Sequence, residues 1–128
     1  MRCVDSTFCF DLLQNDPGAR RRAEELDASS EHLTIAAPAL LEVMEAGYRR
    51  GGKYLLRVRE MVSRFEVLEI GMPEADDAAQ MGARCASRGE TVPHMDLLIA
   101  AAAKRRGLVV LTRDPDFARI PGLSVESY

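Results

Sequence analysis

Short apolar segments alternate with longer segments of helical periodicity along this chain, and this alternation restricts the fold more than any other feature of the sequence. The apolar segments predict strands at Cys3–Val4, Leu33–Ile35, Phe65–Ile70, Leu108–Leu111 and Leu123–Glu126. The intervening segments predict helices at 7–13, 19–26, 54–62, 73–88 and 97–106, with a further helix from Pro38 to a stop at Gly47 or Gly51. The segment Asn15–Gly18 is expected to be a loop. Strands that alternate with helices form a parallel sheet covered on both faces, with the first strand near its centre. The sequence therefore predicts an α/β fold, a three-layer α/β/α domain with a short-stranded parallel sheet.

Size and composition fit one soluble domain that spans residues 1–128, because no linker-like stretch divides the chain. The longest uninterrupted apolar run, Leu97–Ala103, is too short to cross a bilayer. Three cysteines without a CxxC pair favour a reducing cytoplasm and argue against a zinc site or a disulfide framework. The net charge of −3 does not by itself indicate nucleic acid. Basic clusters are nevertheless present, as an RNA-binding surface would require, at Arg20–Arg22, Arg49–Arg50 with Lys53, and Lys104–Arg106.

Four acidic residues fall where the carboxyl ends of the predicted strands meet. Asp5 follows the first strand, and Glu42 lies about one turn into the helix after the second. Asp96 opens the alanine-rich helix before the fourth strand, and Asp114 follows that strand. Catalytic and binding groups of open α/β sheets lie at this edge. The same loops offer no obvious Arg or Lys partner, so the acids are candidate catalytic residues.

Each acid also has an ordinary structural interpretation. Asp96 could be a helix N-cap, Asp114 an Asx-turn residue before Pro115, and Glu42 a solvated helix residue. Asp5 is harder to explain in this way, because a charge beside a central strand is costly unless it is paired. Four independent structural roles would not gather four acids on one edge, so the joint pattern favours a functional site.

A cluster of carboxylates implies a bound cation, because like charges about 4 Å apart repel by roughly 4 kcal/mol at an effective dielectric near 20. Oxygen ligands without Cys or clustered His favour Mg²⁺ or Mn²⁺ over zinc. Such an ion suits phosphodiester hydrolysis, since it can bind the scissile phosphate, activate water and stabilise the leaving oxygen. His94 is a possible base, although its place at the end of a loop makes a surface residue the simpler interpretation.

The residues resemble those of PIN-domain ribonucleases, and especially the VapC toxins of type II toxin–antitoxin pairs. The resemblance extends over the whole chain, through Val4-Asp5-Ser6-Thr7, Leu41-Glu42-Val43, Asp96–Ala101 and Leu111–Phe117. It implies that Asp5, Asp96 and Asp114 bind Mg²⁺ or Mn²⁺ with Asp116 as an outer ligand, and that Glu42 completes the catalytic set. Thr112 would orient the acids or the water, with Thr7 as a second supporting hydroxyl. The family often begins Asp-Thr-Ser or Asp-Thr-Asn, so the order Asp5-Ser6-Thr7 leaves the hydroxyl roles open, and Pro93-His94 has no counterpart in the pattern.

The resemblance further implies an RNA substrate, a homodimer, and a cognate antitoxin that blocks the acidic pocket, commonly with an Arg or Lys. Tyr48, Tyr54 and Leu55 exceed what one core face requires, so we expect a partner to share part of that surface. With few aromatic residues to stack bases, RNA recognition is expected to rely on backbone and shape.

Three alternatives compete with a toxin nuclease. A phosphoacceptor domain is disfavoured, because a dehalogenase-like site needs an acid where Thr7 stands and a receiver needs a Lys that 112–117 lacks. A non-catalytic PIN-fold scaffold would be expected to lose one of the acids. An RNA-processing nuclease that is not a toxin remains open, and a small antitoxin-like reading frame directly upstream would separate the two.

Overall fold

The computed structural model describes residues 1–128 and contains one five-stranded sheet in the order β3-β2-β1-β4-β5. The strands are short: β1 (Arg2–Val4), β2 (Leu33–Ala36), β3 (Glu66–Leu68), β4 (Val109–Leu111) and β5 (Val125–Glu126). Every neighbouring pair is parallel, and Val4 of the central strand lies opposite Ile35 on one side and Leu111 on the other. The predicted parallel sheet with the first strand at its centre is confirmed.

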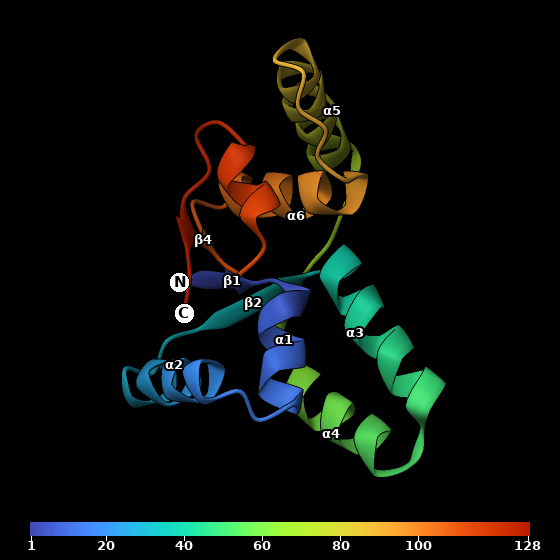
Figure 1. Ribbon diagram of the computed structural model, residues 1–128, viewed down its shortest axis with the longest axis vertical. Helices are drawn as coiled ribbons and strands as arrows, with labels where there is room; N and C mark the ends of the chain where they lie inside the picture. Colours follow the sequence, from blue (N-terminus) through green and yellow to red (C-terminus); the bar gives the residue numbers. More distant parts are fainter.

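Helices cover both faces of this sheet. They are α1 (Ser6–Leu13), α2 (Pro17–Ala28), α3 (Ala37–Arg50), α4 (Gly52–Val62), α5 (Met72–Ser87), α6 (His94–Arg105) and the 3-10 helix η1 (Pro115–Arg119). In Figure 1, α1 to α4 lie on one side of the strands and α5 and α6 on the other, with α5 extending away from the body. The structure is therefore the expected three-layer α/β/α arrangement. None of the helices combines the length and the apolar character needed to cross a lipid bilayer.

The core explains why such short strands suffice. Val4, Ile35, Val110 and Leu111 are fully buried, as expected for parallel strands with helices on both faces. The alanines 100–103 of α6 are also fully buried, and their small side chains let this helix lie directly on β2 and β4. Because α6 packs closely on the sheet, its N-terminal turn is held at the carboxyl edge of the sheet.

One boundary differs from the prediction for a local reason, and the structure decides between the two predicted ends of another helix. Pro17 and Gly18 begin α2 rather than lying in a loop, because the Asp16 side chain accepts the Ala19 amide at 2.9 Å and caps the helix. Helix α3 ends at Gly51, whose φ of 66° favours glycine, and not at Gly47. Gly47 instead lies where α4 approaches, since a Cβ there would meet Val58 at 3.3 Å.

Candidate active site

Asp5 lies at the carboxyl end of the central strand, almost fully buried at 2% exposure. Its amide continues the sheet by donating to the Leu111 carbonyl at 3.1 Å. Its carboxylate oxygen Oδ2 accepts two hydroxyl hydrogen bonds, from Thr112 at 2.8 Å and from Thr7 at 3.1 Å. These bonds fix the carboxylate and leave Oδ1 available to a ligand. A buried charge is costly unless it is hydrogen-bonded, and the two hydroxyls provide those hydrogen bonds.

Asp96 and Asp114 face this edge from the other half of the chain. Asp96 is the third residue of α6, and Pro93 occupies the N-cap position, so Asp96 is not the cap of its helix. Asp114 does have a structural role, because its Oδ1 accepts the Asp116 amide at 2.9 Å and caps η1. The Asp114 amide in turn donates to Thr112 Oγ1 at 2.9 Å. Thr112 thus connects Asp114 to the buried Asp5.

Three of the acids present a compact set of oxygen atoms. One carboxylate oxygen each from Asp96, Asp114 and Asp116 lies within 4.8 Å of the other two. Asp5 and Glu42 do not belong to this closest group, although the resemblance suggested Asp5 as a direct metal ligand. Both nevertheless lie close enough to act on Asp96 electrostatically.

The electrostatics of the cluster appear most clearly at Asp96. Burial and then the charges of Asp114, Asp5, Asp116 and Glu42 raise the pKa of Asp96 from 3.8 to about 7. Burial, followed by the charges of Asp5 and Asp114, also raises the pKa of Glu42, while a hydrogen bond from Ser6 Oγ at 3.3 Å opposes that rise. The cluster therefore carries more negative charge than its own side chains compensate.

One cation does reach the acids, contrary to the expectation from sequence. Arg119 Nη1 lies 3.3 Å from Asp116 Oδ1, three residues earlier in η1. The spacing i, i+3 could have revealed this pair. Arg113 belongs to the same loop but points away from the site, toward Asp11 and Asp16. Asp116 is thereby partly neutralised, whereas no ion pair reaches Asp5, Glu42, Asp96 or Asp114.

The two histidines lie outside this network. His94 is exposed and forms no hydrogen bond with the acids, although it is two residues from Asp96. His32 pairs with Glu66 at 2.7 Å, at the opposite end of the strands. The hydrogen bond that Ser6 donates to Glu42 was not predicted from the sequence motifs.

The donor set fits a hard divalent cation. Carboxylate oxygens are the ligands that such ions prefer, and Asp96, Asp114 and Asp116 offer three of them from two elements. The raised pKa of Asp96 shows that positive charge at this place would be stabilised. The cysteines, by contrast, are all buried and unpaired, and none belongs to the acid cluster.

The family is identified by sequence and by structure. The model of the PIN domain matches residues 2–123. This chain belongs to the PIN-domain family. A tRNA(fMet)-specific endonuclease VapC of Salmonella typhimurium is 30% identical over 128 residues, covering 98% of this chain and 96% of the relative. The solved structure of DNA-bound VapBC from the same organism superposes with a TM-score of 0.84 at 29% identity, covering 99% and 98% of the two chains. VapBC2 of Rickettsia felis, bound to a promoter DNA fragment, shares the fold with a TM-score of 0.85 at 20% identity. The chain is a VapC-type PIN nuclease.

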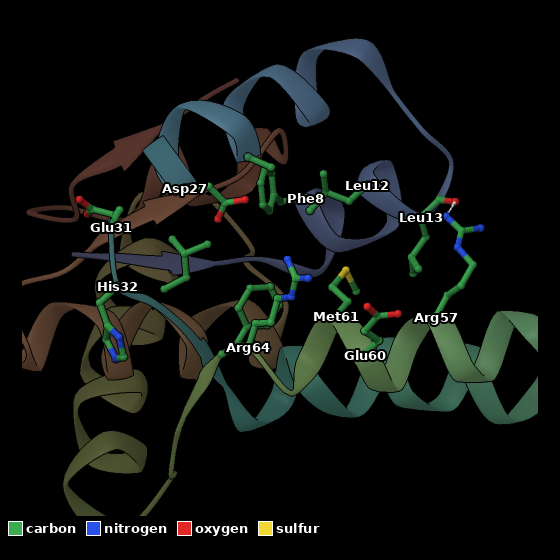
Figure 2. Close-up of a pocket in the computed structure, with 13 residues that line it drawn as sticks. Phe8, Leu12, Leu13, Asp27, Glu31, His32, Arg57, Glu60, Met61 and Arg64 are labelled. Atoms are coloured by element: carbon green, nitrogen blue, oxygen red, sulfur yellow. Dashed lines mark hydrogen bonds between the residues drawn. The ribbon is translucent and has the colours of Figure 1, made fainter. Parts of the chain in front are cut away.

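A second feature of this VapC-type chain is a groove between α1, α2 and α4, away from the acids. Its volume is about 340 Å³, and its apolar lining includes Phe8, Leu12, Leu13, Met61 and Phe65. Figure 2 shows charged side chains around it, with Asp27 and Glu31 on one side, Arg57 and Glu60 on α4, and Arg64 just after α4. Arg57 also donates to the Leu13 carbonyl at 2.9 Å, which ties α4 to the end of α1.

Proposed function

We propose that this chain is a Mg²⁺- or Mn²⁺-dependent endoribonuclease, the toxin of a toxin–antitoxin pair, whose catalytic carboxylates are Asp5, Glu42, Asp96 and Asp114. The observation that carries the proposal is the uncompensated acid cluster, in which neighbouring acids help to raise the pKa of Asp96 to about 7. We also propose that residues 1–128 form a single PIN domain, which one continuous sheet and one core support.

Each acid has a distinct part in the proposed site. Asp96, Asp114 and Asp116 would hold the cation through the oxygens that lie within 4.8 Å of one another. Asp5 would contribute its free Oδ1, because Thr7 and Thr112 orient its other oxygen. A divalent cation bound there would supply charge neutralisation at the scissile phosphate and activation of water. Glu42, whose pKa is raised, is suited to exchange a proton with the attacking or leaving oxygen.

The proposed substrate is RNA, and tRNA is the class to test first. This inference rests on the VapC of Salmonella typhimurium, whose name specifies tRNA(fMet). Exposed basic residues are available near the α3–α4 connection, where Arg49, Arg50 and Lys53 lie close in sequence and exposed to solvent. Phosphate contacts of this kind provide affinity without reading the sequence.

Cleavage of tRNA by the purified protein, with Mg²⁺ and after EDTA, tests the proposal directly. Asp96→Asn and Asp5→Asn should each reduce cleavage by roughly a hundredfold or more, as when one preorganised electrostatic group is removed. Asp76→Asn is the matched control, because Asp76 is an exposed acid on α5 outside the cluster. Activity of Asp96→Asn within a few-fold of wild type would disprove the proposed site.

The proposed partner is an antitoxin that blocks the acidic pocket with an Arg or Lys, and the groove between α1, α2 and α4 is the surface we assign to the rest of its bound segment. The neighbouring solved structures include VapBC complexes. The apolar lining suits the apolar face of an amphipathic helix. The rim suits a helix that presents basic residues toward Asp27 and Glu31 and acidic residues toward Arg57 and Arg64.

A charge placed inside the groove tests this assignment. Met61→Glu should weaken inhibition by the protein of a small reading frame upstream of the gene while leaving tRNA cleavage intact. Met72→Glu is the control, because Met72 is 78% exposed and does not line the groove. Equal inhibition of both variants would exclude the groove as the antitoxin site.

A homodimer in the cytoplasm completes the proposal. Exposed apolar side chains on α3 and α4 support the dimer: Leu41, Tyr48 and Leu56 are each at least 59% exposed. Of the residues expected on this surface, Tyr48 is exposed, Leu55 is partly buried, and Tyr54 packs partly against the core. Three free, buried cysteines support a reducing compartment.

A further inference from the structure

The side chain of Arg113 turns away from the catalytic acids and is held by three neighbours. Its Nη2 lies 3.0 Å from Asp16 Oδ2, and its Nη1 lies 3.4 Å from Asp11 Oδ2. The guanidinium also lies over the ring of Tyr128, 4.5 Å from the ring centre, and donates to the Tyr128 main-chain oxygen at 3.4 Å. One face and the edge of the guanidinium plane are thus oriented by neighbours from three different segments.

The groups that hold Arg113 are themselves fixed. Tyr128 donates its hydroxyl to Asp11 Oδ2 at 2.6 Å, and its ring packs edge-on against the buried Phe8 at 5.0 Å. Burial and this hydrogen bond raise the pKa of the Tyr128 hydroxyl, so it stays a protonated donor at neutral pH. Asp16 is held as the cap of α2 by the Ala19 amide. The residues that contact the Arg113 side chain are therefore held in place by contacts of their own.

Gly18 provides the space for the guanidinium. A Cβ at this position would lie 2.7 Å from Arg113 Nη2, so the guanidinium, at the end of a flexible side chain, would have to move. Gly18 does not have a positive φ and lies in the first turn of α2, so the backbone itself would accept alanine. Seating of Arg113, rather than backbone conformation, accounts for the glycine.

The main chain of the same residue joins the catalytic network. The Arg113 amide donates to Thr7 Oγ1 at 3.2 Å, and Thr7 also donates to Asp5. Arg113 stands between Thr112, which donates to Asp5, and Asp114, which belongs to the carboxylate cluster. The side-chain contacts therefore anchor the one loop that places both residues.

Loss of the Arg113 contacts should affect the stability of the fold and the catalytic rate to different extents. Arg113 is 40% exposed, and ion pairs at that exposure add little to the stability of a fold. A loop that shifts by about 1 Å, however, can lower a catalytic rate about a hundredfold. A loss of the anchor should thus appear in catalysis much more than in melting.

We propose that Arg113, seated by Asp11, Asp16, Gly18 and Tyr128, is a positioning residue that holds the Thr112–Asp114 loop in its catalytic geometry. This inference rests on the proposed nuclease function. It explains why α1 and α2 contact the loop after β4, a contact that the acids by themselves do not require.

The experiment compares Arg113→Ala, Arg113→Lys, Gly18→Ala and the double variant Gly18→Ala/Arg113→Ala with wild type. The measurements are kcat and KM for tRNA, the melting temperature, and the affinity for Mn²⁺ by electron paramagnetic resonance. Gly18→Ala is the sharper variant, because its Cβ would displace the guanidinium while every polar partner remains. Arg84→Ala, an exposed residue of α5, is the control for loss of one positive charge.

We expect Arg113→Ala and Gly18→Ala each to lower kcat by roughly tenfold to a hundredfold with KM changed by less than about twofold. Mn²⁺ should bind each variant more weakly. Arg113→Lys should be intermediate, since lysine keeps the charge but loses the planar fork. In the Arg113→Ala background, Gly18→Ala should have no further effect, because its target is gone.

Three results would overturn the proposal: unchanged kcat in Gly18→Ala, effects of the two substitutions that simply add, or a fall in melting temperature without a fall in kcat. Failure of the nuclease function would look different. If wild type and Asp96→Asn have the same activity, the site itself is wrong, whereas an inactive Asp96→Asn beside a fully active Gly18→Ala refutes only the role of Arg113.

Discussion

Replacing Asp96 with Asn should stabilise the metal-free protein while it removes activity. At pH 8 this carboxylate is ionised and partly buried; burial, and then the charges of Asp114, Asp5, Asp116 and Glu42, raise its pKa to about 7. Asn has nearly the same shape and no charge, so the substitution relieves the repulsion and leaves the packing of α6 in place.

The expected size follows from the pKa. A rise from 3.8 to about 7 corresponds to about 4 kcal/mol of free energy of unfolding. Asp96 is only partly buried, so solvent screens the repulsion and we expect about half of this, about 2 kcal/mol. For a chain of 128 residues, that amounts to an increase of about 8 °C in Tm.

The direction of the pKa shift sets the pH range in which wild type and Asp96→Asn differ in stability. The folded state binds the Asp96 proton more tightly than the unfolded chain, whose carboxyl has a pKa near 3.8. The stability that this proton contributes is fully present below pH 3.8 and is lost as the pH rises through 7. Wild type and Asp96→Asn should therefore differ little at pH 4 and by the full amount at pH 8.

Thermal melts in EDTA at pH 4, 6 and 8 measure this difference, with Asp76→Asn as the control that should follow wild type. Saturating Mg²⁺ at pH 8 should then raise the Tm of wild type more than that of Asp96→Asn. A variant that melts at or below wild type at pH 8, or a difference that does not change with pH, would refute the reasoning.

Three further outcomes are expected. Thr112→Val should lower the free energy of unfolding by about 2 kcal/mol and reduce kcat, because the buried Asp5 loses its 2.8 Å donor; denaturant melts and single-turnover cleavage would measure both, and an unchanged kcat would contradict the role of Thr112. Cleavage should stop in EDTA and return with Mg²⁺ or Mn²⁺ but not with Zn²⁺ at matched free concentration; full activity without metal would point to His94 instead. Leu56→Asp should convert the dimer to a monomer by light scattering, whereas a wild-type protein that is monomeric at high micromolar concentration would remove the dimer from the proposal.

Much of the fold could be predicted from the alternation of apolar and helical segments. Short parallel strands with right-handed connections predicted a first strand near the centre of the sheet. The full strand order, which places the ends of β1 and β4 side by side, was not predicted. The start of α2 at Pro17 and the choice of Gly51 over Gly47 as the end of α3 could not be predicted in this way either. A capping side chain and a neighbouring helix decide them, and neither interaction is encoded in local periodicity.

The candidate site was predictable to a similar depth. The acids could be located because Asp5 and Asp114 follow strands, and Glu42 and Asp96 lie in the first two turns of helices, at one edge. Which of them has the largest rise in pKa could not be foreseen, since it depends on burial of Asp96 and on how many charges surround it. The same holds for Arg113 and Arg119, which are close in sequence and equally charged, yet one points away from the acids and the other pairs with Asp116.

The central position of β1 also has a consequence for synthesis of the protein. Asp5 and Glu42 are among the first residues that leave the ribosome, but the hydroxyl of Thr112 that orients Asp5 comes 107 residues later. Asp96, Asp114 and the strand that carries Thr112 to the centre of the sheet all belong to the last third of the chain. A nascent chain that ends before β4 therefore lacks Asp114 and the Thr112 hydroxyl, so the proposed site cannot form on it. With the proposed catalytic residues, cleavage can begin only after the residues beyond β4 have been made, which gives an antitoxin the whole period of elongation in which to be present.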